Sequence, residues 1–369
     1  VGGSASAVSA AWPIVEAGHR VLMLDQGTGI EKSAVRTSGF LEKRLLEGAA
    51  WREFLGDDFG GLGGSGRETP KMKVPAHQGV LQGFLEAHGI EAEGVAPVGS
   101  LARGGLSLMW GAGAYPYSPA EIADWPVSAE DMEAAYGRVA ARIGISGGDD
   151  LTSVFGVSHP LQKPLRLHPT AERLLTRYED FARRDTRQEF VIRRARNAVV
   201  TEALDGREPC ALTGMCLWGC DRNAIYSADQ EIDRLSRRAN FRYVPGAFVE
   251  ALEPADGGWR ATTSDRFGAA GSRQFSAKNI VLAAGALGST RLALQELKLL
   301  GQPVSLACHP AFAFALWMPS RLGAAWTREM FSLGQLAYQL GAQRDRPDVF
   351  GVIFSSEGIL ASDIVKEFP

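Results

Sequence analysis

The first seven residues put the strongest constraint on how this chain can fold. Residues Gly2–Ala7 fill the positions of a G-x-G-x-x-G/A phosphate loop, with Gly2 at the first position and Ala7 at the third. The apolar residues that follow have the spacing of an amphipathic helix: Val8, Ala11, Trp12 and Val15. A small-residue loop that opens a helix predicts a nucleotide-binding α/β unit.

The next stretch supplies the second half of such a unit. Residues 20–25 form an apolar strand pattern that ends in Asp25, eighteen residues after Ala7. In a dinucleotide-binding unit the pyrophosphate lies at the helix N-terminus, and an acid at this spacing accepts hydrogen bonds from a ribose. Two residues depart from the pattern: Ser4 replaces the middle glycine, and Pro13 lies inside the predicted helix, where proline costs about 3 kcal/mol or bends the axis. The alternative is a glycine-rich turn in an ordinary α/β domain.

Composition narrows the class of protein. The chain has 369 residues, enough for two or three domains, a net charge of −3 and no run of like charge, which argues against a nucleic-acid partner. Its longest apolar run, residues 280–287, is too short for a membrane span. Because the chain starts inside the loop, we expect it to be truncated at the N-terminus and also at the C-terminus. The localisation is therefore left open, with a preference for the cytoplasm.

A second glycine-rich loop lies at residues 104–113. Gly104, Gly105, Ser107 and Trp110 stand there in an otherwise apolar stretch, which suits close approach of the backbone to a flat ring. The alternative is a buried glycine-rich turn. Further on, Ser128 is expected to cap a helix that ends at Gly144.

Three of the four cysteines lie within eleven residues. Cys210, Cys216 and Cys220 have the spacing C-x5-C-x3-C, whereas Cys308 stands alone. Clustered cysteines could hold an iron–sulfur cluster or zinc, two of them could form a disulfide, or the segment could be a tight turn without metal.

The sequence of the second half of the chain predicts a small sheet, followed by a strand and a helix that rejoin the nucleotide-binding unit. Residues 228–238 have a helical pattern. Strands are expected over residues 241–244, 247–252 and 259–263, and these strands are expected to form a small antiparallel excursion from the nucleotide-binding sheet. A continuous apolar strand is expected over residues 278–284, followed by a glycine turn and a helix.

Taken in order, five segments resemble the glucose–methanol–choline family of FAD-dependent oxidoreductases. They are the Gly2–Ala7 loop with Asp25, residues 104–111, residues 124–126, the cysteine segment ending at Ser227, and residues 279–289. The resemblance implies an FAD whose pyrophosphate lies on the first loop, whose ribose meets Asp25 and whose ring lies near Gly105, Ser107 and Trp110. It also implies that adenine meets residues 247–249 and that residues 283–285 form the turn beside it. The implied cofactor-binding residues are Gly2, Gly3, Ser4, Ser6, Ala7, Asp25, Gly104, Gly105, Ser107, Trp110, Val249, Ala284 and Gly285.

The cysteine spacing also resembles that of family members in which three cysteines hold a 3Fe–4S cluster. Related proteins with similar spacing are not known to hold one. The catalytic histidine of the family lies in a C-terminal segment, and nothing in residues 310–369 matches it. The histidines at positions 19, 77, 88, 159, 168 and 309 lack that context, and His309 is expected to be structural. The sequence therefore predicts no catalytic residue within this chain.

The expected fold is α/β: a Rossmann-like FAD-binding domain, with a parallel sheet and flanking helices, plus an α+β substrate domain with an antiparallel sheet. Residues 1–30, 91–115 and 205–300 are assigned to the first domain, 116–204 and 301–369 to the second, and 31–90 to an intervening segment. The resemblance implies oxidation of the CH–OH group of an alcohol or sugar by a dehydrogenase or oxidase, with oxygen, a quinone or an electron-acceptor protein as oxidant. The alternatives are a catalytically silent nucleotide-binding or scaffold protein, and a flavin enzyme with no net redox change.

Overall fold

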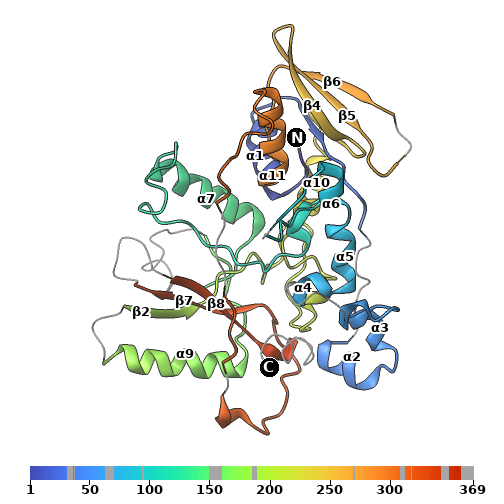
Figure 1. Ribbon diagram of the computed structural model, residues 1–369. Coiled ribbons are helices and arrows are strands. Elements are labelled where there is room, and N and C mark those ends of the chain that lie inside the picture. The colour runs from blue at the N-terminus through green and yellow to red at the C-terminus, as the bar shows by residue number, and fades with distance from the viewer. Residues whose placement is uncertain are drawn as a thin grey trace. The chain divides into compact units, whose positions relative to one another are not determined.

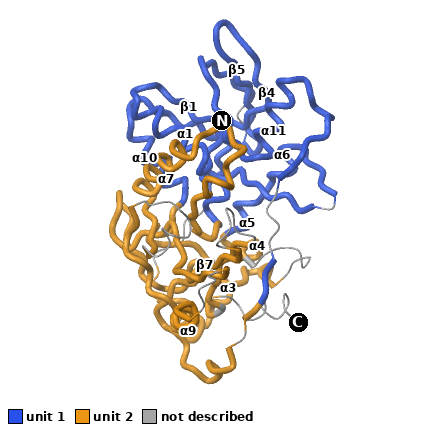
Figure 2. Tube along the Cα trace, turned by 90° about the vertical axis from the view of Figure 1, so that its left-hand side faces the viewer, with its two compact units in different colours: residues 1–31, 77–109, 227–314 blue, residues 32–76, 110–226, 315–369 orange. Residues whose placement is uncertain are grey.

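The computed structural model describes residues 1–30, 36, 38–62, 70–93, 95–148, 160–184, 189–268, 271–307, 312–316, 318–341 and 349–358. The chain divides into two compact units (Figure 2). Unit 1 consists of residues 1–31, 77–109 and 227–314, and unit 2 of residues 32–76, 110–226 and 315–369. Residues 205–226, which we assigned to the FAD-binding domain, fall in unit 2, and residues 77–90 of the intervening segment fall in unit 1.

Unit 1 is built on a parallel pair of strands and the first helix. Helix α1 (Ala5–Glu16) leads into β1 (Val21–Leu24), which pairs in parallel with β3 (Phe241–Val244). Helix α10 (Ala228–Leu235) packs against α1. Their shared apolar core confirms the helix–strand unit expected from the sequence: Val8, Ala11, Trp12, Ile232 and Leu235 are buried in it.

The strand expected over residues 278–284 is not formed, and that prediction was wrong. The Val281 carbonyl accepts a hydrogen bond from the Val1 nitrogen at 2.7 Å, and the Ala283 N–H donates to the Val1 carbonyl at 2.9 Å. A strand needs a ladder of several paired residues, whereas this stretch pairs with one. The helix expected after it is present as α11 (Gly285–Glu296).

The antiparallel excursion is confirmed for residues 247–252 and 259–263, which lie with a third strand in one antiparallel sheet (Figure 1). Its first strand, residues 241–244, was wrongly placed there, because it is β3 and pairs in parallel with β1. Strands β4 (Phe248–Ala255), β5 (Gly258–Ser264) and β6 (Arg273–Ala277) form a sheet in that order, and α11 packs against β4. Asp256 and Gly257 join β4 to β5, as expected for a two-residue hairpin loop. The remaining elements in this part of the chain are α5 (Pro75–Leu81), α6 (Phe84–His88) and η2 (Gly105–Leu108).

Unit 2 contains a second antiparallel sheet, covered by one helix. Strands β2 (Phe190–Arg194), β7 (Gly334–Leu340) and β8 (Val349–Phe354) lie in that order, and α9 (Pro169–Ala182) packs on β2 and β7. The two units together give the mixed α/β architecture expected from the sequence, with one parallel sheet and separate antiparallel sheets.

Unit 2 also contains the helix predicted after Ser128. It is α7 (Ala129–Ile143), where the Ser128 hydroxyl accepts from the Asp131 N–H at 3.0 Å and Gly144 ends the helix. The other elements of this unit are α2 (Phe40–Leu46), α3 (Ala50–Leu55), η1 (Gly60–Leu62), α4 (Pro70–Lys73), η4 (Cys216–Trp218), η5 (Pro319–Arg321) and η6 (Ser356–Gly358). Among the described residues, no helix has the length and apolar character needed to cross a membrane.

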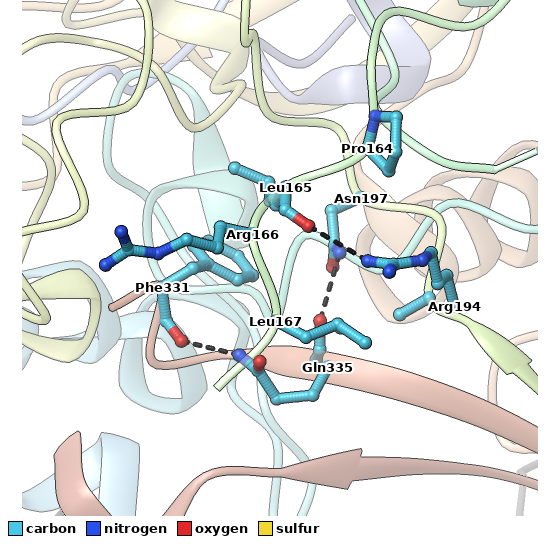
Figure 3. A pocket seen from close by; sticks show the side chains of 10 residues that line it. Pro164, Leu165, Arg166, Leu167, Arg194, Asn197, Phe331 and Gln335 are labelled. Atoms are coloured by element: carbon cyan, nitrogen blue, oxygen red, sulfur yellow. Dashed lines mark hydrogen bonds between the residues drawn. The ribbon is translucent and has the colours of Figure 1, made fainter. Parts of the chain in front are cut away.

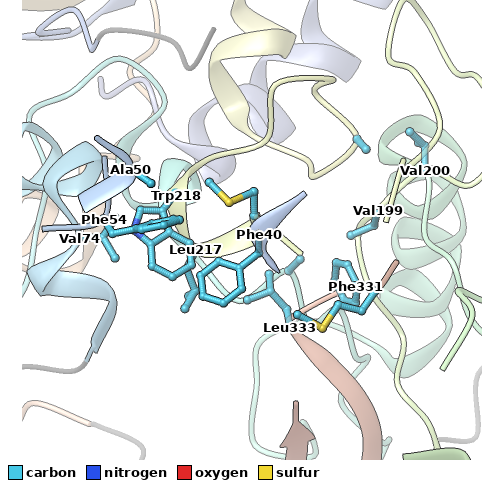
Figure 4. Packing of buried hydrophobic residues seen from close by; sticks show 14 residues of the cluster. Phe40, Ala50, Phe54, Val74, Val199, Val200, Leu217, Trp218, Phe331 and Leu333 are labelled. Atoms are coloured by element: carbon cyan, nitrogen blue, oxygen red, sulfur yellow. The ribbon is translucent and has the colours of Figure 1, made fainter. Parts of the chain in front are cut away.

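The core of unit 2 is an aromatic cluster around Trp218 (Figure 4). The Phe40 ring stacks on Trp218 with 5.1 Å between centroids, and Phe54 meets the indole edge-on at 5.0 Å. The cysteine segment is thereby packed on α2 and α3, because Trp218 lies between Cys216 and Cys220.

A buried histidine joins α9 to the end of β8. His168 caps α9 by accepting the Thr170 N–H on Nδ1 at 3.2 Å, so Nε2 carries the proton and donates to Glu357 Oε1 at 2.9 Å. The Thr327 N–H donates to the other carboxylate oxygen at 2.8 Å. Burial alone would raise the pKa of Glu357, but the hydrogen bonds from His168 and Thr327 outweigh it and hold the pKa below its ordinary value.

We expect Glu357→Gln to lower the free energy of unfolding by about 1–2 kcal/mol at pH 7, because the charged acceptor of two hydrogen bonds is lost. A carboxyl with a lowered folded pKa stabilises above its unfolded pKa and loses that contribution as the pH falls through the folded value. The difference from wild type should therefore shrink below about pH 4 in urea denaturation. Glu208→Gln is the control, because Glu208 pairs with Arg222 on the surface, and should change stability by less than about 0.5 kcal/mol. An equal effect of both changes would contradict the assignment.

Candidate functional site

The loop at the start of unit 1 can be built only from small residues. Gly2 has φ +104, and a Cβ there would lie 2.3 Å from the Ala283 carbonyl oxygen. Its N–H donates to Leu24 at the end of β1 at 2.8 Å. Gly2 therefore allows the loop to pass between β1 and residue 283, as the phosphate-loop pattern requires.

Asp25 packs directly on the second glycine of this loop. A Cβ on Gly3 would lie 2.1 Å from Asp25 Oδ2, so a larger residue could not coexist with this position of the carboxylate. The Tyr243 hydroxyl donates to the same oxygen at 2.8 Å. Strand β3 thus fixes the acid that follows β1, and Gly3 supplies the space that it occupies.

The N-terminus of α1 is available to an anion. Ser4 is the N-cap residue but makes no side-chain capping bond, and the first turn contains no acidic residue. Ser6 is exposed in that turn, its hydroxyl 3.2 Å from the Ser4 hydroxyl, whereas Ala7 is buried against the core. Free N–H groups and the positive end of the helix dipole both favour a phosphate at this position.

The structure brings the second glycine-rich loop against the first. The Gly104 N–H donates to the Gly3 carbonyl at 3.1 Å. Gly105 has φ +60, and a Cβ there would lie 2.9 Å from the Ser4 Cβ. Two loops separated by about a hundred residues therefore meet through glycines, which the order of motifs alone could not establish.

Ser107 has a structural role that the sequence did not predict. Its hydroxyl donates to the Gly104 carbonyl at 2.6 Å and accepts the Ala228 N–H at the start of α10 at 2.8 Å. The single hydroxyl proton is thus used within the protein, and only acceptor capacity remains for a ligand.

The other predicted contacts of unit 1 lie along β4 and α11. The Val249 carbonyl accepts from Arg291 Nη2 at 2.8 Å, and its side chain is buried. The Ala284 N–H donates to the Ser289 hydroxyl at 3.0 Å, and Gly285, the first residue of α11, has open space where a side chain would start. Arg291 was not predicted, and no pattern in a single sequence marks it.

The pKa of the Asp25 carboxyl is raised. Burial raises its pKa to about 6, although the hydrogen bond from Tyr243 and the positive charge of Arg103 act in the opposite direction. The Arg103 guanidinium lies over the Tyr243 ring, 5.3 Å from its centroid, and pairs with Asp233 at 2.5 Å. Tyr243 and Arg103 are thus further members of the site that sequence reasoning missed.

Trp110 belongs to unit 2, where its indole Nε1 donates to the Tyr226 carbonyl at 2.8 Å. Its ring meets Tyr226 edge-on, with 6.0 Å between centroids. These contacts fix Trp110 within its own unit, and its contact with a flavin ring stays a prediction.

The three cysteines of the C-x5-C-x3-C segment lie close together in unit 2. Cys210, Cys216 and Cys220 are free thiols that line one shallow hollow. Burial raises the pKa of Cys210 to about 12 and also raises that of Cys216, so burial favours the protonated form of both thiols. Among the residues that the structure describes, no group of three or more cysteine, histidine or acidic side chains is arranged to hold a metal ion. These described residues thus give no support to the 3Fe–4S cluster that the resemblance implies. Cys308 and His309 lie outside the described residues.

A separate hollow in unit 2 lies between residues 164–167 and the start of β7 (Figure 3). The Asn197 amide donates to the Gly334 carbonyl at 3.0 Å, and the Gln335 amide donates to the Phe331 carbonyl at 2.5 Å. None of the residues predicted to bind the cofactor lines this hollow.

No family model matches this sequence, and no curated protein matches it. Among the solved structures, pyridoxine 4-oxidase from Mesorbium loti aligns with 17% identity and a TM-score of 0.43. The alignment covers 80% of this chain and 50% of the other, so this chain spans half the length of that one.

We expect Arg36→Met to lower the free energy of unfolding by about 2–4 kcal/mol, because Arg36 clamps the cysteine segment. Its guanidinium donates to the carbonyls of Trp218 and Gly219 at 2.7 and 2.6 Å and pairs with Glu53 at 2.8 Å. The change leaves these acceptors without donors in a largely buried position. Each unsatisfied acceptor costs about 1–3 kcal/mol of stability. Urea denaturation followed by tryptophan fluorescence measures the loss. Arg52→Met, on an exposed pair with Asp57, should change stability by less than about 0.5 kcal/mol. A stable Arg36→Met protein would refute the clamp.

We expect Asp25→Asn to raise the stability of the cofactor-free protein by about 1–2 kcal/mol at pH 7.5. A carboxyl whose folded pKa is raised favours the folded state at low pH, and that contribution is lost as the pH rises through the folded value of about 6. Asparagine cannot ionise and retains an oxygen that can accept from Tyr243. The difference from wild type should disappear below about pH 4 in thermal or urea unfolding. A variant less stable than wild type at pH 7.5 would contradict the pKa assignment.

Proposed function

We propose that this chain belongs to an FAD-dependent oxidoreductase that acts on the CH–OH group of an alcohol or sugar. The observation that carries the proposal is the meeting of four elements at one end of β1: the Gly2–Ala7 loop, the open N-terminus of α1, Asp25, and the Gly104–Gly105 loop. A Rossmann-like dinucleotide site uses this combination of small residues, free N–H groups and a ribose-binding acid.

The residues present fit such a cofactor. Gly2 and Gly3 leave room for close approach of a pyrophosphate, and the N–H groups of the first turn of α1 would bind it, together with the hydroxyls of Ser4 and Ser6. Asp25, held by Tyr243, would accept hydrogen bonds from the adenosine ribose. The buried position of Ala7 anchors the helix from which these groups project.

The remaining assignments come from the family resemblance and form part of the proposal. Gly105, Ser107 and Trp110 would lie near the flavin ring, Val249 near adenine, and Ala284 and Gly285 beside it. The FAD-binding domain would consist of residues 1–30, 91–115 and 205–300, and the substrate domain of 116–204 and 301–369. We assign no catalytic base within this chain.

Bound FAD would accept the hydride of the carbinol carbon. The chain's own residues would bind the pyrophosphate, orient the ribose and keep the loops together through the bond between Gly104 and Gly3. Release of the hydroxyl proton requires a base, which in the resembling family is a histidine. The substrate is a small molecule, and an electron-acceptor protein is one of the oxidants that the proposal allows.

An absorption spectrum of the purified full-length protein, before and after dithionite, tests the proposal. We expect flavin bands that bleach on reduction, and turnover of an alcohol or sugar with an artificial electron acceptor. A colourless full-length protein that does not take up added FAD would overturn the flavoenzyme. Bound FAD without turnover would favour the alternative, a catalytically silent nucleotide-binding protein.

We expect Gly2→Ala to weaken FAD binding at least tenfold. The added Cβ would collide with the Ala283 carbonyl oxygen at 2.3 Å and shift the loop that cradles the pyrophosphate. Gly18→Ala is a matched control, because Gly18 also has a positive φ, +83, but a Cβ there meets nothing within 4 Å. Both variants carry similar backbone strain, so a fluorescence titration with FAD separates loop geometry from loss of stability. Equal affinities of the two variants would refute the role of the loop.

A further inference from the structure

One oxygen of the Asp25 carboxylate, Oδ2, is enclosed by the protein within unit 1. The Tyr243 hydroxyl donates to this oxygen at 2.8 Å. A Cβ on Gly3 would lie 2.1 Å from Oδ2, and a Cβ on Gly27 would lie 3.3 Å from it. A ligand that binds Asp25 therefore meets the other oxygen, Oδ1.

The pairing of β1 with β3 places Tyr243 at this carboxylate. Tyr243 pairs with Met23 in the parallel register of the two strands, and Asp25 follows Met23 by two residues. Because side chains alternate between the two faces of a sheet, all three project from the same face. Gly27 provides the space for the tyrosine, since a Cβ there would lie 2.0 Å from the Tyr243 hydroxyl oxygen. The loop after β1 is thus shaped around this hydroxyl.

A second side chain, Arg103, holds the Tyr243 ring. The Arg103 guanidinium lies over that ring, 5.3 Å from its centroid. Its Nη2 pairs with Asp233 of α10 at 2.5 Å. The Arg103 backbone N–H donates to the Thr28 carbonyl at 3.0 Å, which ties the segment that carries Arg103 to the loop after β1. Both ends of the arginine are therefore fixed, and the cation stabilises the position of the ring.

We propose that Tyr243, supported by Arg103, is the positioning residue of the nucleotide site: it holds Asp25 Oδ2 and so presents Oδ1 to a ribose hydroxyl of FAD. The inference rests on the proposed function, which assigns Asp25 to the adenosine ribose. That assignment comes from the spacing of Asp25 after the glycine loop and from its contact with Gly3. Tyr243 acts on the ribose through Asp25.

The same hydrogen bond favours the ionised form of Asp25. Burial raises the pKa of this carboxyl to about 6, and the Tyr243 hydroxyl from β3 and the Arg103 guanidinium, itself paired with Asp233, both act against burial. An ionised carboxylate accepts hydrogen bonds on both oxygens, whereas a protonated one carries a donor on one of them. The affinity for a ribose should therefore fall as the pH falls through about 6. Without the Tyr243 hydroxyl, that fall should begin at a higher pH.

The test is the pH dependence of FAD affinity, measured by fluorescence titration of the full-length protein between pH 5 and pH 8. FAD is a suitable probe because its pyrophosphate keeps a constant charge over this range. We expect Tyr243→Phe, which keeps the ring beneath Arg103, to raise the midpoint of the profile by about one pH unit. Tyr178→Phe is the matched control, because it also removes one hydroxyl that donates a hydrogen bond, to the Phe190 carbonyl at 3.1 Å in unit 2. It should leave the midpoint unchanged.

Two further comparisons show whether Tyr243 acts through Asp25. Asparagine cannot ionise, so Tyr243→Phe should leave the pH profile unchanged in a protein that already carries Asp25→Asn. Arg103→Met should move the midpoint in the same direction as Tyr243→Phe, and Arg103→Lys, which keeps the charge, should restore most of it. A readout without ligand is the pH dependence of the stability difference between Asp25→Asn and its parent, which Tyr243→Phe should also move to higher pH.

The outcomes separate this inference from the proposed function. Bound FAD with equal midpoints in wild type and Tyr243→Phe would overturn the role of Tyr243 and leave the proposed function intact. A shift of the same size in the Asp25→Asn background would overturn it as well. If Tyr243→Phe does not fold, Arg103→Met and Arg103→Lys decide by the same midpoints. A wild-type protein that binds no FAD at any pH would overturn the proposed function, and this inference with it.

Discussion

The site in unit 1 depends on the contact between the Asp25 carboxylate and the Cα of Gly3. The contact is so close that any side chain at position 3 would occupy the place of Oδ2. It joins the end of β1 to the loop that opens α1, and the hydroxyl of Tyr243 holds the carboxylate from β3. The hydrogen bond from Gly104 to Gly3 then adds the second loop. Position 3 is thus the point at which three separate parts of the unit meet.

Much of the fold followed from local patterns in the sequence. The helix after Ala7, the strand before Asp25, the cap at Ser128 and the hairpins of β4–β6 are each set by residues close together in the chain. The stretch expected as a strand over residues 278–284 is paired with the backbone of Val1 through two hydrogen bonds, so the pattern located a segment that pairs but not a ladder of several residues.

The site was predictable only in part, because some of its residues come from distant parts of the chain. The glycines and Asp25 have a recognisable spacing, so sequence could identify them. Tyr243, Arg103 and Arg291 act through residues more than forty positions away, and no spacing rule connects them to their partners. The spacing of the three cysteines left a cluster and a metal-free turn as alternatives, and the bonds from Arg36 to the backbone of the same segment could not be predicted from that spacing.

Two charged side chains are partly buried, and their protein partners compensate them only in part. Asp25 is ionised at neutral pH although burial raises its pKa, and Lys71 stays protonated although burial lowers its pKa. Neither charge helps the empty fold, since each loses hydration that its protein partners only partly replace. In the proposed function, ribose hydroxyls beside Asp25 would supply the interactions that its buried carboxylate lacks. Binding energy and fold stability would therefore be opposed at Asp25, which is the relation expected where a side chain is selected for a ligand and not for packing.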